Sequence, residues 1–382
     1  MAIPQAFREA AFLGKRMLLH KPGRFFATVI GVGIAFFLAT AQFGLLVGWI
    51  NTNTALIRHS GADLWVMAVQ APAFDYGTAI PRQRLYQARS IEGVEWTQPV
   101  FMAWNIWQRG DGRRVNIELV GVDRMYAAGP WMMSSGSLES IRRPNTVVVD
   151  ELYLKTLGID RLGESFEMIG ERATIGGICR GIRTFTASPF VFTSVEQAIR
   201  YDKRYRDDEI TYAVAGCRRG VAVEVVQARM ERAMANVEVL TTHQFCVRSA
   251  KYWMLETGVG ITVVITAFLG LAVATVITSQ TLFAITHDHL PNYAALLALG
   301  FSRNTLLSIV LMQSVVLGAC GIAFGTLLFG CAAWASVRTP IPLETTPLVF
   351  ALLVIGSFAT SLLASLMSAR AVFRVDPITV FR

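Results

Sequence analysis

The chain has 382 residues, of which 53% are hydrophobic and only 16% are charged, and its mean hydropathy is +0.45. This composition excludes an ordinary soluble globular protein and indicates a membrane protein. The formal net charge of +8 could indicate nucleic-acid binding. Much of that excess lies beside the apolar runs, however, so anionic lipid headgroups explain it better.

Residues 1–24 form a basic segment at the start of the chain. Apolar side chains recur on one side of a predicted helix and basic side chains gather on another; they are Phe7, Ala11 and Leu18 against Arg8, Lys15 and Arg16. We expect either an amphipathic elbow segment that lies at the cytoplasmic interface or an ordinary basic flank that sets the topology.

Four apolar runs are long enough to cross a bilayer, which requires about 20 residues in a helix. None of the runs contains Asp, Glu, Lys or Arg, so an ion-coupled transporter or a channel is disfavoured. The first run is too long for the core of a cleaved signal peptide and is expected to be an uncleaved anchor. We therefore predict four transmembrane α-helices, at residues 25–50, 258–286, 304–335 and 347–369.

The distribution of Lys and Arg predicts the orientation of these helices. Five Lys and Arg residues against one Glu precede the first run, and three Arg against one Asp follow the last. Both termini are therefore expected in the cytoplasm, with residues 370–382 as a cytoplasmic tail. Residues 287–303 would also be cytoplasmic, whereas residues 51–256 and the loop 336–346 would lie outside.

The external region 51–256 has the mixed pattern of an α+β domain, plausibly of two small lobes. Period-two stretches and turn residues predict strands at 63–69, 94–107, 113–120, 147–149, 166–169, 173–178, 190–193, 212–216 and 237–240. Capping residues and apolar periodicity predict helices at 83–89, 150–157, 194–198 and 221–234. An odd number of cysteines in the domain leaves room for one disulfide, among Cys179, Cys217 and Cys246.

No motif for catalysis or for nucleotide binding is present. Gly14-Lys15 is followed by Arg16 and lacks the upstream glycine of a phosphate-binding loop. A nucleophile elbow and a zinc-binding helix are also missing. His243 and Cys246 are a lone pair of potential ligands and are interpreted as structural. We therefore expect no enzyme activity, no metal and no cofactor in this chain.

Small residues in the predicted spans indicate where helices approach closely. They occur four residues apart in three of the runs, as Gly44 and Gly48, Gly270 and Ala274, and Gly321 and Gly325.

The whole arrangement resembles the permease subunits of the MacB/FtsX-type ABC transporters. Residues 292–303, NYAALLALGFSR, are similar to the coupling segment EIGILRALGASR of that family, and residues 369–382, ARAVFRVDPITVFR, are similar to its closing segment ARRAARLDPVEALR. Residues 147–152, VVVDEL, resemble a strand and helix of its second external lobe. Residues 289–294, HLPNYA, resemble most the HLPEYA of the DevC-type permeases.

This resemblance implies a permease of the bacterial inner membrane that transmits the motion of a separate ATPase, which would carry ATP and Mg²⁺, to the periplasmic domain. It also implies a periplasmic membrane-fusion adaptor, an outer-membrane channel, a homodimer, and a lipid-like or hydrophobic substrate. The apolar contact to the ATPase would come from Leu290, Tyr293, Leu296 and Leu299. The polar contact would come from Asp288 and from Asn292, a position at which the family has Glu. The full predicted coupling set is Asp288, His289, Leu290, Pro291, Asn292, Tyr293, Leu296, Leu299 and Gly300.

Other functions fit the same layout. A lipoprotein-releasing permease or a permease that regulates a cell-wall hydrolase would differ in the partner of its external domain. A membrane-anchored receptor without an ATPase is a more distant alternative. The stretch from Pro291 to Leu299 also has a second interpretation, as a short amphipathic loop helix with no role in coupling.

Overall fold

The computed structural model describes residues 22–123, 127–186, 188–288, 290–299, 301–340 and 342–373. Most of the predicted elbow segment (1–21), the coupling residues His289 and Gly300, and residues 374–382 of the predicted tail lie outside these ranges. The chain divides into two compact units. We call them the helical unit (Met1–Gly48, Ile261–Val337 and Pro342–Arg382) and the sheet unit (Trp49–Gly260 and Arg338–Ile341).

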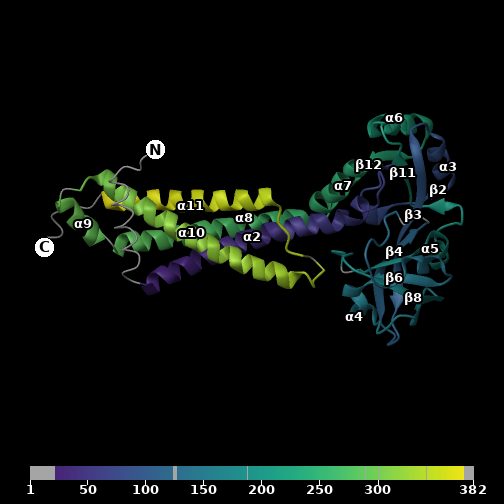
Figure 1. Ribbon diagram of the computed structural model, residues 1–382, viewed down its shortest axis with the longest axis horizontal. Helices are drawn as coiled ribbons and strands as arrows, with labels where there is room; N and C mark the ends of the chain where they lie inside the picture. Colours follow the sequence, from purple (N-terminus) through teal and green to yellow (C-terminus); the bar gives the residue numbers. More distant parts are fainter. Residues whose placement is uncertain are drawn as a thin grey trace. The chain divides into compact units, whose positions relative to one another are not determined.

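Helices occupy all four of the predicted apolar runs. They are α2 (Pro22–Arg58), α8 (Val259–Asp288), α10 (Arg303–Ser336) and α11 (Pro347–Phe373), and a short helix, α9 (Leu290–Ala298), follows α8. Figure 1 shows the long helices running lengthwise beside one another within the helical unit.

Three stretches of the described residues are long and apolar enough to cross a membrane, namely Phe25–Arg58, Gly260–Ile277 and Arg303–Ser336. In the fourth predicted run, Pro347–Leu363 is a shorter apolar helix, so that crossing stays a prediction. The first helix is longer than predicted, because α2 continues without a break to Arg58.

The sheet unit is built on one mixed sheet, in which ten strands join among the described residues in the order β12-β1-β11-β3-β4-β9-β6-β8-β5, with β7 pairing with β3 and β8. The strands are β1 (Leu64–Met67), β3 (Val94–Gln108), β4 (Arg114–Val122), β5 (Met133–Gly136), β6 (Thr146–Asp150), β7 (Ser165–Met168), β8 (Glu171–Cys179), β9 (Phe190–Ser194), β11 (Tyr212–Cys217) and β12 (Glu238–Thr241). A separate pair joins β2 (Ile80–Pro81) and β10 (Glu209–Ile210).

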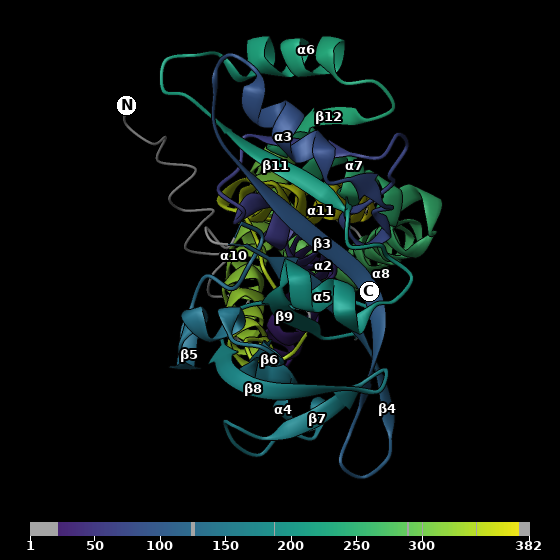
Figure 2. The ribbon, with the colours of Figure 1, turned by 90° about the vertical axis from the view of Figure 1, so that its right-hand side faces the viewer.

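The long strand β3 connects two lobes of this unit. Its first half pairs with β11 and its second half with β4, both antiparallel. Figure 2 shows β3 running from the lobe that carries α3 (Gln83–Ser90), α6 (Val223–Ala233) and β12 to the lobe that carries β5, β7 and β8. The predicted α+β domain of two lobes is therefore confirmed.

Both faces of the sheet are buried. Along β3, Val100 and Met102 belong to one apolar cluster, while Phe101 and Ala103 belong to another on the opposite side. Side chains of a strand point alternately to the two faces, so β3 contributes to both cores. Helices α3, α5 (Val195–Tyr201) and α6 contribute to the core that contains Phe101 and Ala103, and α7 (Thr242–Lys251) contributes Phe245 to the core that contains Val100 and Met102.

The predicted helix at 150–157 is the clearest error in the sheet unit. Asp150 ends β6, and its carboxylate accepts a hydrogen bond from the backbone N–H of Leu152 (2.9 Å), which caps a 3-10 turn, η3 (Glu151–Tyr153). Only Leu154–Leu157 forms α4, and it ends at Gly158, whose φ is +72°. Strands β2, β5 and β10 and helix α7 were not predicted. The five cysteines, all within the described ranges, are free, so the possible disulfide is not formed.

Candidate coupling site

Helix α9 covers nine residues, Leu290–Ala298, and lies between α8 and α10 in the chain. At its carboxyl end the backbone N–H groups of Leu299 and Phe301 donate to the carbonyl oxygens of Ala295 (3.0 Å) and Leu296 (3.1 Å). The hydroxyl of Ser302 then accepts a hydrogen bond from the N–H of Thr305 (3.2 Å) and caps α10. Since both helix ends are satisfied within a few residues, the turn between α9 and α10 is defined locally.

One face of α9 packs against the beginning of α10. Tyr293 is fully buried, as are Leu306 and Ile309 of α10, and Leu290, Leu296 and Leu297 pack around them. The Tyr293 hydroxyl donates a hydrogen bond to Oε1 of Gln313 (3.0 Å), which is itself buried. Burial of an aromatic ring together with a satisfied hydroxyl fixes both the position and the rotation of α9 on α10.

The opposite face of α9 is exposed. Pro291 and Asn292 lie on it, and the Leu299 side chain at its end is 76% exposed. Asp288, at the end of α8, is also exposed. Residues 290–299 contain no charged side chain, so the surface that α9 presents is apolar with one amide.

The structure therefore divides the predicted coupling residues into two groups. Asp288, Pro291, Asn292 and Leu299 are exposed, whereas Leu290 and Leu296 are half-buried against α10. The prediction that Tyr293 contacts a partner is wrong, because its ring and hydroxyl are enclosed by this chain. Gln313, which the sequence analysis missed, belongs to the site as the partner of Tyr293.

Helix α10 crosses α2 at very short range. A Cβ atom on Gly325 would lie 2.5 Å from the carbonyl oxygen of Gly33, and one on Gly321 would lie 2.5 Å from a methyl carbon of Val32. Ordinary carbon contacts are about 3.5–4.0 Å, so only glycine fits at these positions. Gly321 and Gly325, which were predicted to mediate helix packing, thus lie at a close crossing with Gly33, a residue that no G-x-x-x-G pattern contains.

The remaining small residues differ among themselves. A Cβ on Gly44 would lie 3.0 Å from the ring of Phe329, and a Cβ on Gly48 would overlap the backbone of Pro342. Among the described residues, a Cβ on Gly270 would meet only Gln42, at 3.8 Å, which is an ordinary contact. Within the described structure Gly270 therefore does not lie at a close helix crossing. The side chain of Ala274 is outside the described part of the structure.

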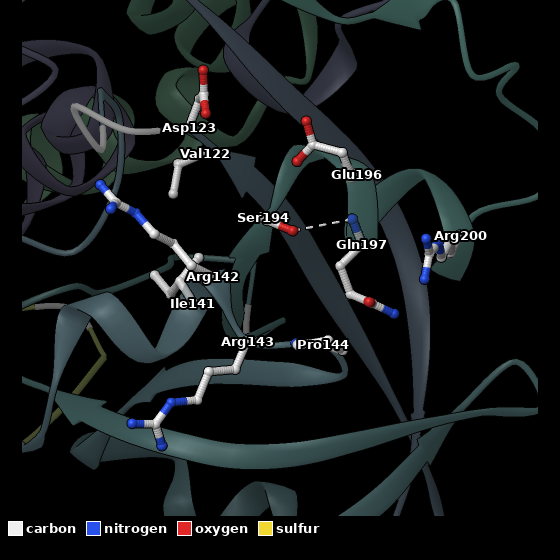
Figure 3. A pocket seen from close by; sticks show the side chains of 10 residues that line it. All are labelled: Val122, Asp123, Ile141, Arg142, Arg143, Pro144, Ser194, Glu196, Gln197 and Arg200. Atoms are coloured by element: carbon white, nitrogen blue, oxygen red, sulfur yellow. Dashed lines mark hydrogen bonds between the residues drawn. The ribbon is translucent and has the colours of Figure 1, made fainter.

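The sheet unit contains a polar cavity of about 520 Å³, shown in Figure 3, between η2 (Leu138–Arg142) and α5. Arg143 and Arg200 extend to opposite sides of it, and the Ser194 hydroxyl accepts a hydrogen bond from the N–H of Gln197 (3.2 Å). These side chains do not converge on one point, so the cavity lacks the geometry of a catalytic or anion-binding site. Among the described residues, no group of three His, Cys, Asp or Glu could hold a metal ion.

Comparison with known families assigns both parts of the chain. Residues 25–233 match the MacB-like periplasmic core domain, and residues 264–377 match the FtsX-like permease C-terminal region. The chain belongs to the MacB/FtsX-type ABC permeases. As a member of this family it is a multi-pass membrane protein with a periplasmic domain, and the sheet unit contains most of that domain. Neither matched region is an ATPase domain, and permeases of this type generally pair with an ABC ATPase.

Two solved structures resemble the periplasmic part of this MacB/FtsX-type permease. The periplasmic region of MacB from Actinobacillus actinomycetemcomitans is 11% identical, covers 48% of this chain and 91% of its own, and gives a TM-score of 0.38. The extracellular domain of the noncanonic ABC-type transporter YknZ from Gram-positive bacteria is 8% identical, covers 47% of this chain and 98% of its own, and gives a TM-score of 0.36. Among curated proteins, no sequence matches the chain.

Proposed function

We propose that this permease is the membrane subunit of an ABC export system and that α9 receives the motion of a separate ATPase subunit. The observation that carries the proposal is the full burial of Tyr293 between α9 and α10. A contact helix that is anchored in this way moves together with α10 when a partner displaces it, whereas a loosely attached loop would yield.

The path from α9 onward is rigid. Helix α10 meets α2 at Gly33, Gly321 and Gly325, where backbone touches backbone and leaves no room for side chains to adjust. Helix α2 is a single helix of 37 residues, Pro22–Arg58. Close-packed interiors transmit displacement, so these three helices supply a mechanical connection from α9 toward the periplasmic domain. Substrate need not pass between the spans in this mechanism.

In this proposal both termini and α9 lie in the cytoplasm of a bacterium, and the membrane is the inner membrane. The excess of Lys and Arg around the first and last runs supports this orientation. ATP and Mg²⁺ would bind to the partner ATPase, and this chain would hold no cofactor of its own.

The export route and the substrate class are proposed from the resemblance of residues 289–294, HLPNYA, to the DevC-type permeases. A permease of that type works as a homodimer with a periplasmic membrane-fusion adaptor and an outer-membrane channel, and its substrate is lipid-like or hydrophobic. A lipoprotein-releasing or hydrolase-regulating role would share the coupling helix and differ in the periplasmic partner.

The contact with the ATPase is proposed to depend mainly on apolar burial. Asn292 can form hydrogen bonds but no ion pair, so the charge that Glu would supply at this position is missing. Leu299 is 76% exposed in the chain, and fully burying a leucine contributes about 1.5–3 kcal/mol. Leu296, by contrast, is already packed on α10, and changing it would disturb α9 itself.

The experiment is an ATPase assay on the full chain co-purified with its nucleotide-binding subunit. Leu299→Asp should remove both the co-purification and the stimulation of ATP hydrolysis, because it places a charge in the apolar contact. Leu162→Asp is the matched control, since Leu162 is a leucine exposed on the sheet unit, and it should leave both unchanged. Stimulation that persists in Leu299→Asp, or a chain that purifies without any nucleotide-binding subunit, contradicts the proposal; the second result favours a receptor.

A further inference from the structure

The sheet unit buries two carboxyl side chains against each other. Asp75 lies in a 3-10 turn, η1 (Phe74–Tyr76), and is 5% exposed, while Glu118 lies in β4 and is fully buried. Both side chains line the same small cavity, and the charge of Asp75 helps to raise the pKa of Glu118. A carboxylate has only acceptor atoms, so the two groups can form a hydrogen bond to each other only when one of them carries a proton.

Hydrogen bonds from the protein reach only one of the two oxygens of Glu118 in the described structure. Its Oε1 atom accepts hydrogen bonds from the hydroxyls of Thr184 (3.3 Å) and Thr186 (2.6 Å). Its Oε2 atom is buried and receives no hydrogen bond from an N–H or hydroxyl group of the described residues. Oε2 is thus the Glu118 oxygen that is available to bind a proton.

Asp75 connects the pair to the segment that leads into α8. Its Oδ2 atom accepts a hydrogen bond from the indole N–H of Trp253 (3.1 Å), which lies in a π-helix, η4 (Tyr252–Glu256). The Trp253 ring also packs edge-on against Phe185, with 4.4 Å between the centroids. Phe185 belongs to the same loop as the two threonines, so one network holds η4 on the sheet unit. Single-turn π-helices are frequent at functional positions.

The segment that leaves the first span meets the same network. Asn53 of α2 is 9% exposed, and neither its amide nitrogen nor its amide oxygen has a hydrogen-bond partner within the described structure. With Asp75 and Glu118 it lines a cavity of only about 10 Å³. That volume is about the minimum for one water molecule, so solvent cannot screen the two carboxyl groups.

Few charges surround the pair. Arg183 is the one cation that lines the cavity among the described residues; it also attracts the carboxylate of Asp150. Burial raises the pKa of Tyr153 to about 12 and also raises the pKa of Tyr76 and of Tyr212, so these three phenols stay neutral at ordinary pH. Tyr252 of η4 lies beside Tyr76, with 5.5 Å between the ring centroids.

We propose that Asp75 and Glu118 form a proton-binding site that keeps η4 docked on the periplasmic sheet unit, and that release of the shared proton frees η4. On release, the carboxyl O–H bond breaks, the proton passes to water, and two carboxylates are left in contact. Like charges in a buried site repel strongly. Asp75 then moves away from Glu118. Trp253, which stays hydrogen-bonded to Asp75, moves with it.

The direction of the pH effect follows from burial. Desolvation raises the pKa of Asp75 to about 6 and raises the pKa of Glu118 well above its ordinary value, the Asp75 charge adding to the second shift. The folded unit therefore binds protons more tightly than the unfolded chain. Docking of η4 is strongest in mild acid and weakens as the pH rises through the ionisation of Asp75 and then of Glu118. This regulation concerns the sheet unit and does not depend on the ATPase contact of α9.

The test is hydrogen exchange by mass spectrometry on the full chain in lipid nanodiscs, with exchange times scaled to the intrinsic rate at each pH. Protection of the peptide that covers Tyr252–Glu256 should fall by about tenfold or more between about pH 5 and about pH 9. In Glu118→Gln the amide N–H replaces the shared proton, so protection should stay constant across that range. Glu139→Gln, at an exposed position in η2, should keep the wild-type profile.

Two further measurements apply even if Glu118→Gln fails to fold. The wild-type infrared spectrum near neutral pH should contain the C=O band of a buried protonated carboxyl group. Trp253→Phe should lower η4 protection in acid and keep that band, because it removes only the N–H donor. A wild-type profile that does not change with pH, the same pH dependence in Glu118→Gln, or the absence of the acid band would overturn the proposal. Protection that depends on EDTA would overturn it as well, since it would assign the pair to a cation.

Discussion

The contact between α2 and α10 gives the sharpest mechanical prediction. In Gly325→Leu the new Cβ would lie 2.5 Å from the backbone oxygen of Gly33 and 2.9 Å from the ring of Phe36. The first of these atoms is backbone and cannot rotate away, so the two helices must separate. Overpacking of this kind lowers the free energy of unfolding by about 1–3 kcal/mol. We expect a loss near the upper end of this range.

Gly330→Leu is the matched control in the same helix. Among the atoms that the structure describes, a Cβ on Gly330 has none within 4 Å apart from its own helix, so leucine there meets open space. Both substitutions gain about the same helix propensity, up to about 1 kcal/mol relative to glycine. The difference between the two variants therefore isolates the cost of the crossing.

The assay is unfolding of the purified chain in mixed micelles with increasing denaturing detergent. Gly325→Leu should be less stable than Gly330→Leu by about 3 kcal/mol, which is roughly a hundredfold in the unfolding equilibrium. With the partner ATPase, Gly325→Leu should still bind through α9 but should no longer couple ATP hydrolysis to export. Equal stability of the two variants would refute the close crossing.

Three more predictions follow from single contacts. Tyr293→Phe leaves the buried Gln313 oxygen without its donor and should destabilise α9 by about 1–3 kcal/mol, seen as faster hydrogen exchange in α9; unchanged exchange would contradict the anchor. Gly270→Ala should be neutral or stabilising by up to about 1 kcal/mol in the same detergent titration; a marked loss would show that Gly270 packs against another helix. Burial raises the pKa of Asp75 from 3.8 to about 6, so the free energy of unfolding of the sheet unit should fall by about 3 kcal/mol between about pH 4 and about pH 7. Chemical denaturation at several pH values, with Glu118→Gln for comparison, measures this change. A free energy of unfolding that rises with pH would contradict the prediction.

The long helices could be predicted from the sequence because length and apolar composition determine them. Their ends depend on other signals. The hydroxyl of Ser302 caps α10, which begins at Arg303, one residue before the predicted start of the span. Nothing in the composition stops α2 at residue 50, and it continues to Arg58. Helix α7 was missed although Thr241 and Gln244 form a capping box at its start. That motif was a usable signal.

The parts of the site that the sequence did not reveal arise from contacts between distant segments. Tyr293 was predicted to face a partner, because a periodic apolar face does not show whether the chain itself covers it. Asp75 and Glu118 are far apart in the sequence, and each is common at a protein surface. The one local hint is that Glu118 stands between Ile117 and Leu119 in a strand buried on both faces.

The contact between α9 and an ATPase is the central claim, and crosslinking tests it most directly. A photo-crosslinker attached at Leu299→Cys in the native membrane should form an adduct with a nucleotide-binding subunit, and ATP binding should change its yield. The same crosslinker at Leu162→Cys on the sheet unit should form none. The account is contradicted if the two positions give the same adducts, or if Leu299→Cys reaches only lipid.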